Sequence, residues 1–377
     1  RIYRITGHRV SASYSIEKLM WLKKHEPEVY EKTYKMLQAK DYIIQRATGN
    51  FVTDYSDASG TQALDLRKLE WSEEILKAAD IDWDKLPKLK KSTDIAGYIQ
   101  ERVAGEIGLP AGTPVVLGGG DGPVSAVGAA CIRDGEFYLT FGTSAWIGGT
   151  TTEPFIDEDK TVFCFAHVIP GRYMPCGTMQ AAGSSYSYIR HALCDDLPYE
   201  ELNRMIEASP AGAQNLIFLP YLLGERSPRW NPDTSAAFLG IKPEHDKKDY
   251  VRAVIEGIAM NMELILKAYR KQAKIETMNL TGGGAKGEVV AQILSDVLNV
   301  RFRMPDCVES ATAIGAAVIA GVGVGVFEDF DEIRRFLKFE KEVEPNPDTQ
   351  EVYDRLKPVF DEAYECLVPL YEKLAKL

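Results

Sequence analysis

Three glycine-rich turns, each directly after a stretch with the pattern of a β-strand, constrain this chain most. They are GGGDG at residues 118–122, FGTS at 141–144 and TGGGAKG at 281–287. Glycine lacks a Cβ atom, so backbone amides in such turns can approach an anion closely, and a following helix N-terminus adds a favourable dipole. Together the turns predict an α/β protein that handles phosphate. The Walker pattern GxxxxGK[ST] does not occur, which argues against a P-loop fold.

The first part of the chain is predicted to be mainly helical. Residues 14–48 place apolar side chains at helical spacing and fit two or three helices. The segment DYSDASGT at 54–61 is dense in Asp, Ser and Gly and predicts a loop, after which a helix is expected around residues 72–79. The turn PAGT at 110–113 precedes a change of character, so we assign residues 1–112 to a first domain.

From residue 113 onward, strand-like and helix-like segments alternate. This alternation predicts a mixed or parallel sheet with helices on its faces, and a long amphipathic helix is expected from about 247 to 271. We assign residues 113–345 to a second domain and residues 346–377 to a charged helical tail.

Composition excludes several classes of protein. Of the 377 residues, 45% are hydrophobic and 26% are charged, a balance typical of a soluble globular chain. The net charge of −11 and the lack of clustered Lys and Arg argue against nucleic-acid binding. Neither an apolar run of about 20 residues nor a secretory signal is present, so we expect no membrane association and a cytoplasmic location. A homodimer is the commonest assembly for such a protein.

The cysteines and histidines do not predict a metal site or disulfides. The six cysteines lie far apart without CxxC spacing, which favours reduced, mostly buried thiols. The five histidines show no paired spacing, so we expect no histidine-ligated metal.

Asp121 is the candidate catalytic residue, and two interpretations of it are open. It lies in the first glycine turn at the carboxyl end of the strand predicted at 115–117, where open α/β sheets place their ligand crevices. A carboxylate there could accept a hydroxyl proton and orient the oxygen for attack on a γ-phosphoryl group. Alternatively, Asp121 only caps a helix that starts at Pro123. The two interpretations are compatible, because a helix N-terminus favours an ionised carboxylate.

The other two turns also have two interpretations each. Gly142, Thr143 and Ser144 could hold a phosphate with two amides and two hydroxyls, or they form an ordinary turn. The run Gly282, Gly283 and Gly284 would let a flat nucleoside lie against bare backbone, or it only connects a strand tightly to a helix.

In their order along the chain, these motifs resemble the FGGY carbohydrate kinases, and most closely the xylulokinase-like branch. Residues 13–25 (SYSIEKLMWLKKH) are similar to the first signature of the family, and residues 235–257 are similar to the second. Further similar segments are KDYIIQRATG at 40–49, DYSDASGT at 54–61, FLPYLLGERSPRW at 218–230 and ESATAIGAA at 309–317.

The resemblance implies an actin-like, ribonuclease-H-like fold of two domains that binds a sugar, ATP and Mg²⁺. It places Asp121 on the catalytic base of the family, with Asp121 and Gly122 at the substrate. It assigns the residues expected to contact the nucleotide as follows: Gly142, Thr143 and Ser144 in a phosphate loop, Gly183 as a further nucleotide contact, and Gly282, Gly283, Gly284 and Gly287 around the adenosine.

The chain also departs from the family pattern. The opening segment of the family, with an Asp-x-Gly-Thr phosphate loop, has no counterpart here, so the first domain is expected to be incomplete. Gly122 stands where xylulokinases commonly have Asn, and Gly287 where relatives often have Asn or Ser. The expected function is an ATP-dependent kinase for a ketose such as D-xylulose. The alternative is a catalytically incomplete nucleotide-binding subunit that needs a partner chain to supply the first phosphate loop.

Overall fold

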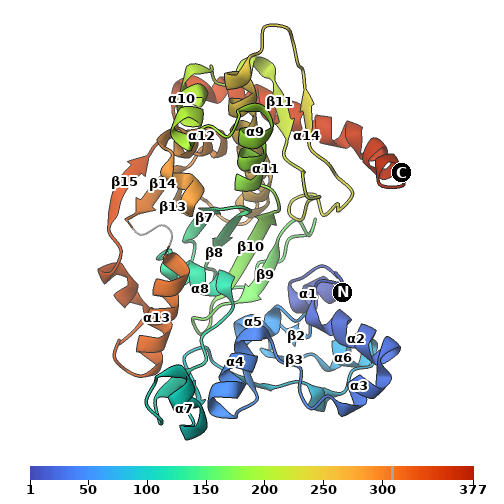
Figure 1. Cartoon of the computed structure of the whole chain (residues 1–377), viewed down its shortest axis with the longest axis vertical. Coiled ribbons are helices and arrows are strands. Elements are labelled where there is room, and N and C mark those ends of the chain that lie inside the picture. Colours follow the sequence, from blue (N-terminus) through green and yellow to red (C-terminus); the bar gives the residue numbers. More distant parts are fainter. Residues whose placement is uncertain (307–309) are drawn as a thin grey trace. The chain divides into compact units, whose positions relative to one another are not determined.

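The structure is a computed structural model that describes residues 1–306 and 310–377. Cys307, expected to be a reduced thiol, and Glu309, the first residue of the segment 309–317, lie outside the described residues. The chain divides into two compact units (Figure 1). The first unit comprises residues 1–136, 149–175 and 310–337, and the second comprises 137–148, 176–309 and 338–377.

The first unit is built mostly from helices with three short strand pairs. β1 pairs with β4 in parallel, and the pairs β2–β3 and β5–β6 are antiparallel. Its elements are α1 (Ile2–Thr6), α2 (Ser15–His25), α3 (Pro27–Lys32), α4 (Ala39–Thr48), β1 (Val52–Asp54), α5 (Tyr55–Ser59), β2 (Leu64–Asp65), β3 (Glu70–Trp71), α6 (Glu73–Ala79), η1 (Trp83–Lys85), β4 (Lys88–Lys90), β5 (Ile95–Tyr98), α7 (Glu101–Ile107), β6 (Pro114–Val116), α8 (Asp121–Gly128), β9 (Phe163–Ala166), α13 (Ala311–Gly323) and η4 (Phe330–Arg335).

Helices α2, α3 and α4 confirm the helical prediction for residues 14–48, and α6 confirms the helix expected around 72–79. The loop predicted for 54–61 is wrong, because α5 occupies residues 55–59. Asp54 is the N-cap of this helix, and its carboxylate accepts the backbone N–H groups of Ser56 and Asp57. Asp and Ser favour helix caps as strongly as loops, so their density marked the start of a short helix.

Two glycines allow α8 and α13 to pack closely within the first unit. A Cβ atom at Gly128 would lie 1.6 Å from the carbonyl oxygen of Ala311, and one at Gly315 would lie 2.2 Å from that of Val124. The hydroxyls of Ser125 and Thr312 are 2.6 Å apart across the same contact. The small residues of the described part of this segment, 310–317, therefore allow a close helix crossing, which holds α8 in place.

The second unit contains a mixed sheet whose strands follow the order β15-β14-β13-β7-β8-β10. β13 is parallel to β14 and β7, whereas the pairs β14–β15 and β8–β10 are antiparallel, which confirms the expected mixed sheet. The elements are β7 (Phe137–Phe141), β8 (Ala145–Gly149), β10 (Tyr173–Met179, which begins in the first unit), α9 (Gly183–Leu193), α10 (Tyr199–Ala208), η2 (Ala213–Asn215), β11 (Ile217–Leu219), β12 (Ala237–Leu239), α11 (Lys247–Arg270), β13 (Thr277–Thr281), η3 (Gly283–Lys286), α12 (Glu288–Leu298), β14 (Arg301–Pro305), β15 (Phe339–Val343) and α14 (Pro347–Leu374).

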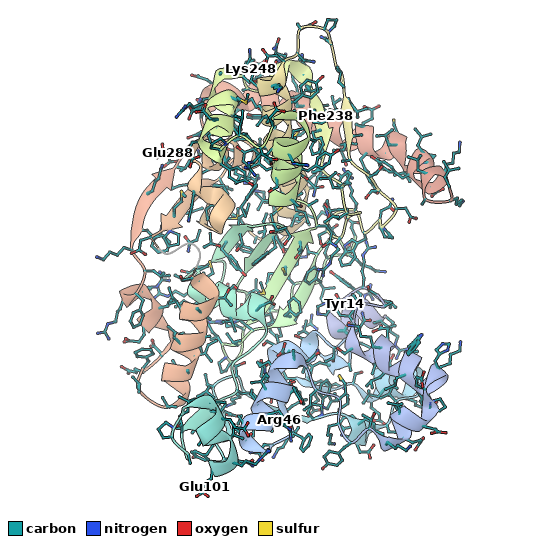
Figure 2. All side chains as sticks on the ribbon, in the orientation of Figure 1. Tyr14, Arg46, Glu101, Phe238, Lys248 and Glu288 are labelled. Carbon is teal, nitrogen blue, oxygen red and sulfur yellow. The ribbon has the colours of Figure 1, made fainter. Side chains whose placement is uncertain are left out.

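Helix α11 is the central helix of the second unit and confirms the long helix expected at 247–271. It packs against α9, α10 and α12 (Figure 1). The ring of Phe238, labelled in Figure 2, lies 4.6 Å from that of Phe218 and 5.2 Å from that of Tyr250, centroid to centroid. Apolar packing from α11 and from the hairpin β11–β12 thus stabilises this part of the unit.

A buried polar cluster joins α11 to α14. Arg252 Nε lies 2.6 Å from Glu256 Oε1, and the hydroxyl of Tyr353 donates to the same oxygen at 2.9 Å. Burial raises the pKa of Glu256, and Arg252 opposes that shift. A buried carboxylate needs such partners, so the cluster fixes how the predicted C-terminal helix packs.

Five cysteines fall within the described residues, and all are free thiols. Four are buried and Cys366 is exposed. Over the described part of the chain, no helix is both long enough and apolar enough to cross a bilayer.

Candidate active site

The glycine turn at 118–122 leads from β6 into α8. Gly118 has φ +68°, a left-handed conformation that favours glycine. Gly120 is the N-cap and Asp121 is the first residue of the helix, so the expectation that Asp121 caps a helix starting at Pro123 is wrong. The Asp121 side chain is exposed, and its Oδ1 accepts the Gly122 N–H at 2.8 Å. The carboxylate is thus solvent-accessible at the start of a helix whose dipole favours negative charge.

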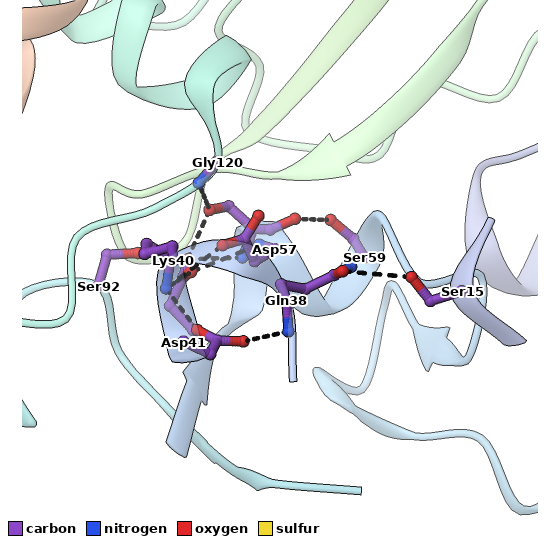
Figure 3. A network of polar contacts seen from close by, with 10 residues as sticks. Ser15, Gln38, Lys40, Asp41, Asp57, Ser59, Ser92 and Gly120 are labelled. Atoms are coloured by element: carbon purple, nitrogen blue, oxygen red, sulfur yellow. Dashed lines mark hydrogen bonds and ion pairs between the residues drawn. The ribbon is translucent and has the colours of Figure 1, made fainter. Parts of the chain in front are cut away.

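A cluster of one lysine and three aspartates lies beside this turn (Figure 3). The Lys40 ammonium is 2.7 Å from Asp41 Oδ1, 3.2 Å from Asp54 Oδ1 and 3.3 Å from Asp57 Oδ2. Asp41 and Asp54 are fully buried, whereas the Asp57 side chain is 19% exposed. We call these four residues the Lys40 cluster. The ammonium occupies the position where three convergent carboxylates would otherwise attract a cation.

Hydrogen bonds connect the Lys40 cluster to the turn that carries Asp121. Ser56 Oγ donates to Asp54 Oδ2, and the same oxygen atom of Asp54 accepts the hydroxyl of Ser92 at 2.9 Å. Ser56 Oγ in turn accepts the backbone N–H of Gly120 at 2.9 Å (Figure 3). A Cβ atom at Gly119 would lie 2.7 Å from Ser56 Oγ, so only glycine permits this close approach.

In the Lys40 cluster, three carboxylates that repel one another surround a single ammonium group. Burial and the neighbouring carboxylate of Asp54 raise the pKa of Asp57 to about 7, against the opposing effect of Lys40. Burial alone would lower the pKa of Lys40, but the carboxylates of Asp54, Asp57 and Asp41 outweigh it and raise that pKa. The lysine therefore stays charged, while Asp57 can exchange a proton near neutral pH.

The second unit contains a cavity of about 610 Å³ at the other two glycine turns. Six of the eight residues expected to contact a nucleotide line it, whereas Ser144 and Gly282 are adjacent to lining residues. The cavity is lined by Phe141, Gly142, Thr143, Gly183, Tyr186, Ser187, Tyr199, Glu200, Asn203, Gly283, Gly284, Lys286, Gly287 and Val290. Its volume and mixture of aromatic, polar and bare backbone surface suit a ligand of the size of a nucleotide.

Two glycines at the cavity, Gly183 and Gly282, are required by close backbone contacts. The turn 142–144 packs on the start of α9, where the Gly183 N–H donates to Gly142 O at 2.9 Å, and a Cβ at Gly183 would lie 2.5 Å from that oxygen. Gly282 has φ +93°, and a Cβ there would lie 2.4 Å from Phe141 O. Gly282, Gly284 and Gly287 have the GxGxxG spacing that is typical of dinucleotide-binding loops. In that motif the glycines open the helix, whereas here a 3-10 turn, Gly283–Lys286, precedes α12. The first residue of that helix is Glu288, labelled in Figure 2, and it is ion-paired with Lys341.

Sequence reasoning missed one wall of this cavity. The Tyr186 hydroxyl donates to Asn203 Oδ1 at 3.0 Å, and the ring of Tyr186 lies 5.2 Å from that of Tyr199. Asn203 Nδ2 is 3.0 Å from the place where a Cβ of Gly287 would lie. These side chains come from α9 and α10, and only the aromatic segment SSYSY at 184–188 gave a local signal. The Asn203 amide therefore lies next to the space that a side chain at position 287 would occupy.

No group of three or more His, Cys, Asp or Glu side chains within residues 1–306 and 310–377 is arranged to hold a metal ion.

Comparison with known proteins gives a consistent assignment. Residues 1–128 match the N-terminal domain, and residues 137–324 the C-terminal domain, of the FGGY family of carbohydrate kinases. Xylulose kinase of Lactococcus lactis is 31% identical over 372 residues, which are 97% of this chain and 73% of that protein.

Two solved structures from Lactobacillus acidophilus, a ligand-bound xylulose kinase and a gluconate kinase, each superpose with a TM-score of 0.94 at 33% identity. Each alignment covers 99% of this chain and 76% of the other. The fold is therefore the two-domain α/β fold of the actin-like ATPases, and the chain is a carbohydrate kinase similar to xylulokinases. This chain belongs to the FGGY family of carbohydrate kinases.

Proposed function

We propose that this chain transfers the γ-phosphoryl group of ATP to a hydroxyl of a ketose such as D-xylulose, with Asp121 as the catalytic base. The observation that carries the proposal is the exposed carboxylate of Asp121 at the first turn of α8, on a turn that is bonded to a buried cluster. Similarity to xylulose kinases supports the sugar class, and similarity to a gluconate kinase makes gluconate the second substrate to test.

In the proposed reaction, Asp121 accepts the proton of the attacking sugar hydroxyl. The sugar oxygen forms a bond to the γ-phosphorus while the bond between that phosphorus and the β–γ bridging oxygen breaks, which yields ADP and a sugar phosphate. A positioned base contributes about 10²- to 10⁴-fold to the rate. Gly122 would lie beside the same sugar hydroxyl, a proposal supported by the hydrogen bond from its N–H to Asp121 Oδ1.

We propose that ATP binds in the cavity of the second unit. The turn 142–144 and Gly183 at the start of α9 border the cavity and would lie against the phosphate groups, with the hydroxyls of Thr143 and Ser144 as hydrogen-bond donors. The adenosine would lie on the bare backbone of the turn 282–287, with the Asn203 amide at its edge. Mg²⁺ would accompany the phosphates.

The direct test is ADP release by the purified chain with D-xylulose, D-ribulose, gluconate, glycerol and no sugar. We expect turnover with a ketose, and Asp121→Asn should lower kcat by about 10²- to 10⁴-fold. Asp348→Asn is a matched control, because Asp348 is also an exposed aspartate in the first turn of a helix. Wild-type kcat in Asp121→Asn would remove Asp121 as the base. A chain that binds ATP but phosphorylates a sugar only after a partner chain is added would instead support the nucleotide-binding subunit.

A further inference from the structure

The backbone N–H of Gly120 has a side-chain partner that the chemistry described so far does not use. It donates to Ser56 Oγ at 2.9 Å, across 64 positions of sequence. Gly120 is the residue directly before Asp121 and is the N-cap of α8. This hydrogen bond therefore acts at the point where the chain sets the direction of the Asp121 backbone.

Ser56 is itself held by a chain of buried polar contacts. It is 2% exposed, and both its N–H and its hydroxyl donate to Asp54 Oδ2. Asp54 Oδ1 faces the Lys40 ammonium at 3.2 Å, and Ser92 Oγ donates to Asp54 Oδ2. Because the hydroxyl of Ser56 donates to Asp54, its oxygen lone pairs remain to accept the N–H of Gly120, and the cluster fixes the direction of that hydrogen bond.

The contact is tight as well as polar. A Cβ atom at Gly119 would lie 2.3 Å from Val168 Cγ1 and 2.7 Å from Ser56 Oγ, and one at Gly120 would lie 3.2 Å from Asp57 Oδ1. The turn consequently rests on the cluster without an intervening side chain. Packed backbone of this kind has little freedom to shift unless its support moves.

Resting on the function proposed above, we propose that Lys40 and Asp54 act through Ser56 as positioning residues for the turn that carries Asp121. The cluster is a buried, ion-paired support, and the Ser56–Gly120 hydrogen bond transmits its position to the catalytic carboxylate. A purely structural cluster would stabilise the unit without affecting the reacting geometry. Misplacement of a reacting group by about 1 Å can lower the rate about 100-fold. A positioning role can therefore be distinguished from a purely structural role by its effect on kcat.

Ser56→Ala is the central variant, and the chain offers a matched control. Ser59 lies on the same helix and is 1% exposed, but its hydroxyl donates to Ser56 O at 2.7 Å and accepts the N–H of Ala166. Ser59→Ala therefore deletes an equally buried hydroxyl that does not touch the turn. We expect Ser56→Ala to lower kcat about 10- to 100-fold with KM values within about 3-fold of wild type, whereas Ser59→Ala keeps kcat.

Two further measurements separate positioning from loss of folded protein. Amide hydrogen exchange at Gly120 should accelerate at least about 10-fold in Ser56→Ala and stay unchanged in Ser59→Ala, since only the first removes the acceptor of that N–H. Lys40→Arg retains a cation among the carboxylates and should keep more of kcat than Lys40→Met, with both values normalised to the folded fraction.

The outcomes also distinguish this inference from the proposed function. If Asp121→Asn is inactive but Ser56→Ala matches Ser59→Ala in kcat and in Gly120 exchange, the positioning role is overturned and the catalytic base stands. If Asp121→Asn retains wild-type kcat, the function of Asp121 itself fails. A loss in Ser56→Ala that appears only in the two KM values would also overturn the positioning role.

Discussion

Gly183→Ala tests whether the backbone contact between the turn 142–144 and α9 shapes the nucleotide cavity. The new Cβ atom would lie 2.5 Å from Gly142 O, against the 3.4 Å at which ordinary contact begins, so one backbone must move by about 0.9 Å. The contact involves backbone on both sides, and no flexible side chain can yield. Three hydrogen bonds resist the movement: Gly183 N to Gly142 O, and the N–H groups of residues 182 and 184 to Thr143 O.

Two opposing terms set the size of the effect on stability. Overpacking costs about 1–3 kcal/mol, whereas alanine is favoured over glycine in a helix by about 1 kcal/mol. The net loss should be about 1 kcal/mol, which lowers Tm by about 2–4 °C in a unit of this size. A displaced phosphate loop should also lower kcat/KM for ATP by about 10- to 100-fold.

Gly105→Ala is the matched control. Gly105 also lies in a helix, α7, but a Cβ atom there would meet nothing within 4 Å. It should raise Tm by a few degrees without changing kinetics, because only the helix-propensity term remains. Thermal unfolding and initial rates at varied ATP provide both readouts. If Gly183→Ala behaves like Gly105→Ala in both assays, the turn 142–144 is not held by this contact.

Three further outcomes are expected. Asn203→Ala should raise KM for ATP about 3- to 10-fold at constant kcat, since one hydrogen-bonding group of the cavity is lost; an unchanged KM in initial-rate assays would exclude Asn203 from ATP binding. Tyr353→Phe should lower the free energy of unfolding by about 1–3 kcal/mol in urea titrations, because Glu256 loses a buried donor; equal midpoints for variant and wild type would contradict this. Burial raises the pKa of Glu225 to about 8, so the folded chain retains a proton that the unfolded chain loses, and stability should fall as pH rises from about 5 to 8 and then level off. Glu225→Gln should flatten this part of the urea-midpoint profile, and an unaltered slope would count against the assignment.

The sequence by itself determined the local structure and the family of this protein. Apolar spacing located α2 to α4 and α11, because the 3.6-residue period is a property of the helix alone. The glycine turns were evident because a residue without Cβ is needed wherever backbones nearly touch, as at Gly282. The error at 54–61 arose because Asp and Ser are typical of loops and of helix caps alike, and only the position of Asp54 in space separates the two.

The tertiary structure alone decided which distant residues act together. Lys40, Asp54 and Gly120 are joined through Ser56, although no sequence pattern links residues this far apart. Asn203 reaches Gly287 in the same way, from a helix that carried no glycine signal. Local propensity depends on neighbours within a few residues, whereas charge pairing, burial and steric exclusion depend on distances that exist only after the chain has folded.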